Sequence, residues 1–193
     1  MSDVRTAIAD RPLVLDGGLG TMLEARGHDL SSALWSTAVL LDAPEDVRAV
    51  HAEFVAAGAD VVTTASYQLG YENLAAAGRS PREVDALLAA SVRLAREAAG
   101  ERAWVAASVG PFGAVRADGS EYTGGYDLSV AELTRWHRRR IEVLADAAPD
   151  LLAIETIASP AEVEAVVAAL QGIEVPAWIS LSASSTAFAD DDV

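Results

Sequence analysis

The chain has 193 residues, 51% of them hydrophobic and 22% charged, a composition typical of a soluble globular protein with one sizeable core. Its net charge of −15 argues against nucleic acid and anionic membranes as partners, because both would be repelled. The absence of cysteine and of lysine excludes disulfides, thiolate nucleophiles, Cys-ligated zinc, Schiff bases and Walker-type phosphate binding in this chain.

The N-terminal residues lack the long apolar region of a signal peptide, and no run of about 18 apolar residues indicates a membrane span. We therefore expect a cytoplasmic protein.

The first predicted element is a short strand at Pro12–Leu15, apolar enough to be buried on both faces. Asp16 follows where the strand ends, and three of the next four residues are glycines that expose backbone amides before a short helix at Thr21–Arg26. A carboxylate beside the amides of Gly17 and Gly18 suits an amino acid, with the ammonium on Asp16 and the carboxylate on the amides. A tight turn with a capping aspartate explains the same residues.

The segment Gly27–Leu41 is predicted to be an apolar loop across one end of the core. A helix is expected to begin at Asp42, acting as its cap, with Pro44 in the first turn, and to end at Gly58. The second buried strand is then predicted at Ala59–Thr64.

Polar side chains gather where this second strand ends. Thr64, Ser66 and Tyr67 fall within a row of hydroxyls and an amide for which a plain strand has little use. They are candidates for the lining of a site, although hydroxyls at a strand end also cap turns.

Capping boxes predict three further helices. These span Ser80–Gly100, Ser129–Ala148 and Ser159–Gly172, and the predicted strands between and after them are Ala103–Ser108, Leu151–Ile154 and Ala177–Ser182. The fourth strand leads into Glu155 and Thr156. A glycine-rich loop at 109–113 and a polar aromatic loop at 118–126 follow the third strand, and loops of this length are either functional or solvated excursions. The aspartates at 190–192 are expected to be a solvated terminus.

Strands and helices alternate five times, which predicts an α/β fold with a parallel sheet and right-handed crossovers. Polar residues end strands one to four alike, whereas an open sheet would concentrate them at one switch point. The pattern therefore favours a (β/α)8 TIM barrel, whose usual length is about 250 residues, present here as an incomplete barrel of about five βα units in one domain spanning 1–193.

Taken together, these segments resemble the homocysteine S-methyltransferase family, zinc-dependent (β/α)8 enzymes that convert homocysteine to methionine with donors such as S-methylmethionine or S-adenosylmethionine. The resemblance runs in order to Ser182. It rests on LDGGLGTMLEARG at 15–27, LW at 34–35 with the following PEDVRAVHAEFVAAGAD, TTASYQ at 63–68, SVGPFGA and ADGSEYTGGY at 108–126, and DLLAIETI at 150–157.

The resemblance implies that Asp16 and Glu155 bind the ammonium of homocysteine. The amides near Gly17 and Gly18, with Thr156, would hold its carboxylate. Thr64, Ser66 and Tyr67 would line the same pocket.

The resemblance also implies a departure from the family. Its zinc is held by three cysteines, one in a GxNC motif after the sixth strand and two in a GGCC motif at the eighth, and this chain ends before either. His28, His51 and His137 are expected to be surface or packing residues away from the strand ends. We therefore expect the amino-acid pocket without bound zinc, and no methyl transfer by the chain alone.

Three alternatives remain open. One is a non-catalytic half-barrel that self-associates through its open edges or pairs with a partner supplying the missing strands. Another is a different carboxylate-based barrel enzyme, such as a glycosidase, although the few tyrosines are a poor match for its aromatic platforms. The third is a premature stop or frameshift, which translation of the downstream DNA would reveal.

Overall fold

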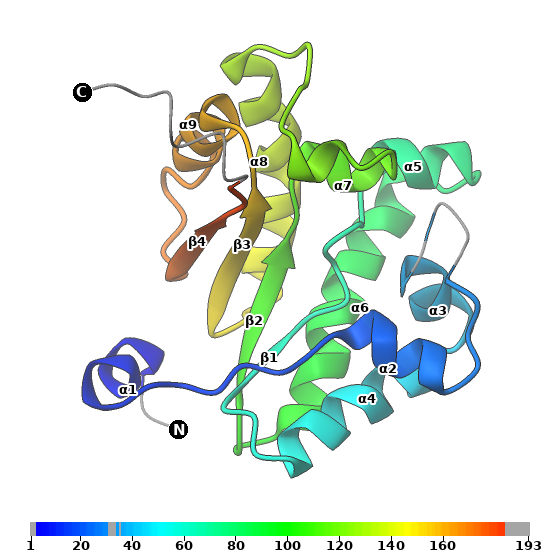
Figure 1. Ribbon diagram of the computed structural model, residues 1–193, viewed down its shortest axis with the longest axis vertical. Coiled ribbons are helices and arrows are strands. Elements are labelled where there is room, and N and C mark those ends of the chain that lie inside the picture. The colour runs from blue at the N-terminus through cyan, green and yellow to red at the C-terminus, as the bar shows by residue number, and fades with distance from the viewer. Residues whose placement is uncertain (1–2, 31–33, 35, 184–193) are drawn as a thin grey trace.

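The computed structural model describes residues 3–30, 34 and 36–183 (Figure 1). The three aspartates at 190–192, expected to be solvated, lie outside the described residues. So does position 35 of the LW pair.

Four parallel strands form one sheet, in the order β1 (Val61–Thr63), β2 (Trp104–Val109), β3 (Leu151–Ile157) and β4 (Ala177–Leu181). Helices connect them, so the predicted alternation in a parallel α/β fold is confirmed. The helices are α1 (Val4–Asp10), α2 (Leu19–Ala25), α3 (Ser36–Asp42), α4 (Pro44–Ala56), α5 (Tyr71–Ala76), α6 (Pro81–Ala99), α7 (Phe112–Arg116), the 3-10 turn η1 (Ser120–Tyr122), α8 (Val130–Asp146) and α9 (Pro160–Ala169).

The long helices begin where the capping boxes predict. Ser80 caps α6 with Glu83, and Ser129 caps α8 with Glu132, each pair bonded in both directions. The third box is only half formed. Ser159 accepts from the Glu162 amide at 3.4 Å, but the Glu162 carboxylate points into the protein instead of returning to the cap.

The first predicted strand is reduced to a single bridge between Leu15 and Val61. Hydrogen bonds from Asp60 and Val61 to the Val14 carbonyl align the segment with β1. Val14 and Leu15 are nevertheless 57% and 51% exposed, so the expected burial on both faces is wrong. Within the described residues only β1 pairs with this segment, and a strand with one neighbour keeps its other edge in solvent.

Other boundaries also differ from expectation. The predicted loop at 27–41 contains the start of α3, which runs to Asp42, so Ala43 rather than Asp42 is the N-cap of α4. Pro44 occupies the first turn as expected. Helices α1, α5 and α7 have seven, six and five residues, too few for a 3.6-residue period to be recognised.

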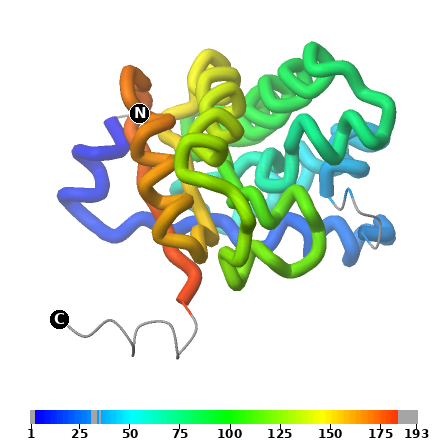
Figure 2. The backbone as a smooth tube through the Cα atoms, turned by 90° about the horizontal axis from the view of Figure 1, so that it is seen from above, coloured from blue at the N-terminus to red at the C-terminus, as the bar shows by residue number. Residues whose placement is uncertain are grey.

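The two faces of the sheet bury different partners. The outer face carries Val62 of β1, Val105 of β2 and Ile154 of β3, which share one core with the long helices. Helices α4, α6, α8 and α9 follow one another around this side (Figure 2). The inner face carries a smaller cluster that includes Val61 and Ala106, closed off by Val4 of α1.

Strand alternation decides which residues reach the open end of the inner face. Val61, Ala106 and Ala153 point inward, so Thr63, Ser108 and Glu155, two positions further along each strand, lie on the same side at the carboxyl ends. In contrast, β4 was expected to be buried, but its end residues Ala177 and Leu181 are exposed.

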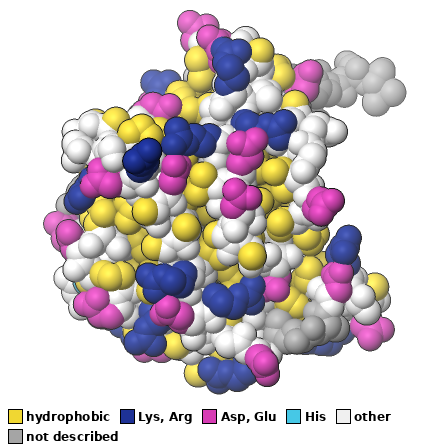
Figure 3. Space-filling view, turned by 180° about the vertical axis from the view of Figure 1, so that it is seen from behind, with side chains coloured by type: hydrophobic (Ala, Val, Ile, Leu, Met, Phe, Trp, Pro, Cys, Tyr) yellow, Lys and Arg dark blue, Asp and Glu magenta, His cyan; other side chains and the backbone are white. Residues whose placement is uncertain are grey.

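The outer surface is mixed in charge. Basic and acidic side chains alternate with apolar ones over the face seen in Figure 3. None of the helices in the described part of the chain combines the length and apolar character needed to cross a bilayer.

Candidate binding site

A cavity of about 600 Å³ opens at the carboxyl ends of the strands. It gathers six of the eight residues predicted from the sequence, namely Asp16, Gly17, Gly18, Thr64, Tyr67 and Glu155. The other two, Ser66 and Thr156, are adjacent in sequence to lining residues but do not line the cavity themselves.

Asp16 is fixed by β1. Its carboxylate accepts the Thr63 amide N–H at 2.8 Å and the Thr63 hydroxyl at 2.9 Å. Burial raises the pKa of Asp16 because desolvation disfavours the carboxylate, and the two bonds from Thr63 oppose that rise. The side chain is therefore a positioned acceptor with little water around it.

Glu155 is presented by a break in β3. The pairing of β3 with β4 shifts register between Ile154 and Ile157, and Thr156 within this bulge has a φ of 65°. A β-branched residue in the left-handed region is strained, and such strain is held only by the surrounding structure. The bulge aims Glu155 into the cavity, where the Ser108 hydroxyl donates to its carboxylate.

The two carboxylates line the same cavity. Burial raises the pKa of Glu155 most, and the Asp16 charge raises it further, against the hydrogen bond from Ser108. A cation placed between them would relieve both desolvation and repulsion.

Thr64 and Ser66 hold two strands together. The Thr64 hydroxyl lies 2.6 Å from the Ser66 hydroxyl and accepts the Ser108 amide at 2.9 Å, while Ser66 donates to the Ser108 carbonyl at 2.7 Å. Both are buried, and their bonds lock the end of β1 to β2. Their side-chain bonds therefore join two strands instead of capping a turn, and Thr64 also lines the cavity.

Tyr67 follows Ser66 in the chain and lines the cavity together with Asp16 and Glu155. Burial raises its pKa to about 12, the charges of Glu121 and Glu155 add to the rise, and a hydrogen bond with Thr156 opposes it. The phenol is therefore protonated at neutral pH, and it lines the same cavity as Glu121 and Glu155.

Sequence reasoning missed several lining residues. Strand alternation from Val61 could have found Thr63, and alternation along β2 could have found Ser108. Glu121 and Tyr122 come from the polar aromatic loop flagged as functional or solvated, but no local pattern marks them as inward-facing. The remaining lining residues missed from the sequence are Leu15, Leu19, Gly20, Leu30, Ser36, Ala65, Gln68, Trp178 and Ser180.

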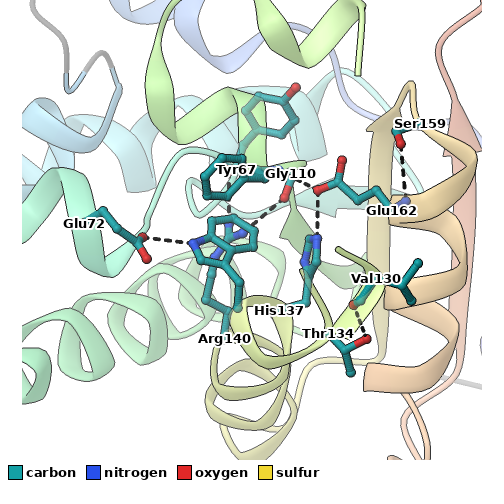
Figure 4. Close-up of polar contacts among 11 residues, drawn as sticks. Tyr67, Glu72, Gly110, Val130, Thr134, His137, Arg140, Ser159 and Glu162 are labelled. Carbon is teal, nitrogen blue, oxygen red and sulfur yellow. Dashed lines mark hydrogen bonds and ion pairs between the residues drawn. The ribbon is translucent and has the colours of Figure 1, made fainter. Parts of the chain in front are cut away.

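A buried polar cluster supports the loops around the cavity (Figure 4). Arg140 of α8 is fully buried and donates to the Gly110 and Tyr67 carbonyls, each at 3.1 Å. Glu162 of α9 accepts the Phe112 amide at 2.6 Å and lies 2.9 Å from Nε2 of His137. These bonds tie the segments after β1 and β2 to the helices behind them.

The histidines do not form a metal centre in the described residues, where no group of three or more His, Cys, Asp or Glu side chains is placed to hold an ion. His28 pairs with Asp46 at 2.7 Å. His51 is buried in the core, which lowers its pKa to about 4. His137 is also buried, and through Glu162 it touches the segment after β2, closer to the strand ends than expected. The three-cysteine zinc site of the resemblance does not fit residues that include no cysteine.

The fold and the cavity define a parallel α/β barrel-type protein with an acidic cavity at the carboxyl ends of its strands. The family model for homocysteine S-methyltransferase matches residues 13–192. The chain belongs to the homocysteine S-methyltransferase family.

Similar proteins agree with this assignment. The chain is 47% identical to homocysteine S-methyltransferase 4 of Zea mays, over 88% of this chain and 55% of that protein, and 42% identical to homocysteine S-methyltransferase YbgG of Bacillus subtilis, over 95% and 62%. The metallated form of the Escherichia coli homocysteine methyltransferase MmuM matches with a TM-score of 0.86 and 42% identity, covering 93% of this chain and 66% of that one. The chain thus spans a little over half the length of its curated relatives, and the TIM-barrel fold is confirmed for that part.

Proposed function

We propose that this chain binds L-homocysteine by its amino-acid end, as the substrate of methyl transfer that yields methionine. The observation that carries the proposal is the pair of half-buried carboxylates, Asp16 and Glu155, which line one cavity and whose pKa values are both raised by desolvation. The family gives the ligand class, and the geometry gives a role to each group.

The ammonium of homocysteine would lie between Asp16 and Glu155, both already oriented by Thr63 and Ser108. Its carboxylate would take the amides near Gly17 and Gly18, with Thr156. Thr64 and Tyr67 would complete the wall, and Ser66 would hold Thr64 from behind. A pocket fixed before the ligand arrives loses little entropy on binding.

We infer that the described chain does not activate the thiol by itself. Thiol activation by zinc needs soft ligands that lower the thiol pKa, and the sequence has no cysteine to supply them. We expect substoichiometric zinc in the purified chain and no methionine from homocysteine with S-methylmethionine or S-adenosylmethionine. Methionine formation, followed by mass spectrometry, would contradict this inference.

Calorimetric titration of L-homocysteine tests the binding proposal. Asp16→Asn and Glu155→Gln should each weaken binding by roughly tenfold or more, because each removes a charge-assisted contact of about 1.5–3 kcal/mol. The controls are Asp10→Asn in α1 and Glu164→Gln in α9, which remove one exposed carboxylate each. Absence of binding by the wild type, or equal affinity in Asp16→Asn, would overturn the proposal.

Self-association is the second candidate property, favoured by exposed apolar residues. Leu181 of β4 is 57% exposed and Ile8 of α1 is 62% exposed, and a groove between these elements is lined by Leu13 and Trp178. Apolar surface of this kind favours contact with a second copy. Sedimentation velocity should show a concentration-dependent oligomer, and a monomer at all concentrations would exclude it.

A further inference from the structure

Glu121 is a third carboxylate in the cavity, and none of the homocysteine groups assigned above interacts with it. It lies in η1, lines the cavity and is only 7% exposed. Its Oε2 is buried without a hydrogen-bond partner. A buried carboxylate oxygen left unpaired is costly unless a ligand supplies its partner.

Glu121 is separate from the pair that holds the ammonium. The charges of Glu121 and Glu155 both raise the pKa of Tyr67, so the phenol lies near both, whereas the charge that acts on Glu155 is that of Asp16. Glu121 enters the cavity from η1, whereas Asp16 precedes α2 and Glu155 belongs to β3, and Tyr67 lines the same cavity.

The backbone holds Glu121 firmly in place. A Cβ added at Gly113 of α7 would overlap the backbone of Ser120 and Glu121, so the two turns pack with no room between them. Helix α7 is in turn held by Glu162, whose carboxylate accepts the Phe112 amide. The carboxylate is thus a preset feature of the cavity wall.

The charge of the cavity exceeds what one amino acid can balance. Three carboxylates line it, and no arginine or histidine is among the lining residues of the described chain. Homocysteine brings one ammonium and one carboxylate, so it adds no net charge. A second ligand with a net positive charge would reduce the remaining imbalance.

We propose that Glu121, beside Tyr67, forms a subsite for the positive charge of the co-substrate, a sulfonium methyl donor, and so selects charged donors over neutral thioethers. The inference rests on the proposed function, since it needs homocysteine in the neighbouring position. The aromatic face of Tyr67 adds a second attraction for a soft organic cation. Glu121 is a specificity-determining residue that takes no part in bond making.

The test compares two ligands that differ by one methyl group and one charge. The purified chain, saturated with L-homocysteine so that the Asp16 position is filled, is titrated with S-methyl-L-methionine or with L-methionine. The wild type should bind the sulfonium roughly tenfold more tightly than the thioether. Glu121→Gln should abolish that preference, Glu121→Asp should retain part of it, and Glu164→Gln should leave it unchanged.

The outcomes distinguish the proposal about Glu121 from the proposal of homocysteine binding on which it rests. A preference that survives in Glu121→Gln, or a wild type that binds homocysteine but shows no preference for the sulfonium, overturns the subsite and leaves the homocysteine proposal standing. A wild type that binds no homocysteine overturns both. Because homocysteine binding is measured in every variant, a misfolded Glu121→Gln is recognised, and Glu121→Asp then decides the case.

Discussion

Replacing Glu162 should destabilise the segment after β2, which includes Phe112 and carries part of the cavity wall. The Glu162 Oε1 accepts the Phe112 amide at 2.6 Å and the Nε2 hydrogen of His137 at 2.9 Å; Glu162 and His137 are fully buried, and Phe112 is half-buried. Burial lowers the pKa of His137, so the ring is neutral at pH 7 and donates one hydrogen to this carboxylate.

The magnitude follows from what Glu162→Ala leaves behind. Two buried donors lose their acceptor at about 1–3 kcal/mol each, and the lost methylenes leave a small cavity, while alanine recovers a few tenths in helix propensity. We expect a loss of about 3–5 kcal/mol, a large share of a typical stability of about 5–15 kcal/mol. Glu162→Gln keeps an acceptor oxygen and should lose only about 1 kcal/mol.

Urea denaturation followed by circular dichroism measures both variants, with Glu164→Ala on the same helix as the exposed control. The reasoning is refuted if Glu162→Ala lies within about 1 kcal/mol of Glu164→Ala, because the carboxylate would then not be satisfying buried donors.

Three further predictions concern the cavity itself. Because burial raises the pKa of Asp16 and Glu155, homocysteine affinity should fall as the pH drops through these raised values, at a higher pH than ordinary carboxylates require. The same two groups should make the free protein more stable as the pH falls, because the folded state binds protons more readily than the unfolded state. Calorimetric titrations and thermal melts between pH 4 and 8 measure both effects, and a pH-independent affinity would contradict the assignment. Thr63→Val removes one donor to Asp16 and should weaken homocysteine binding by roughly fivefold or more with the fold intact, measured by calorimetry; unchanged affinity would mean that this bond does not orient the carboxylate. Gly113→Ala should destabilise the protein by about 1–3 kcal/mol, since its Cβ would overlap backbone at Glu121, and a neutral effect on the melting temperature would show that the two turns separate freely.

Local chemistry made the regular part of this fold predictable. Capping boxes at Ser80 and Ser129 set the starts of α6 and α8, and apolar runs located the buried strands β2 and β3. At Ser159 the helix also begins as predicted, but only half of the box forms, because the Glu162 side chain bonds the Phe112 amide and His137 inside the protein. Capping is a local preference that a tertiary partner overrides.

The candidate site was predictable at its two carboxylates and less so around them. Asp16 and Glu155 follow apolar runs, and both line the cavity. The sequence favoured Thr64 over Thr63, although the Thr63 side chain is the one that donates to Asp16. Neighbouring residues of a strand point to opposite faces of the sheet, so an error of one residue selects the wrong face. Glu121 reaches the cavity through a turn that only the packing against Gly113 defines, so no periodicity could reveal it.

Comparing L-homocysteine with 4-mercaptobutanoate, the same molecule without its ammonium, tests the central claim most directly. If Asp16 and Glu155 recognise the ammonium, the purified chain should bind homocysteine at least roughly a hundredfold more tightly than the analogue, since the analogue lacks two charge-assisted contacts. Equal affinity for the two ligands would contradict the account.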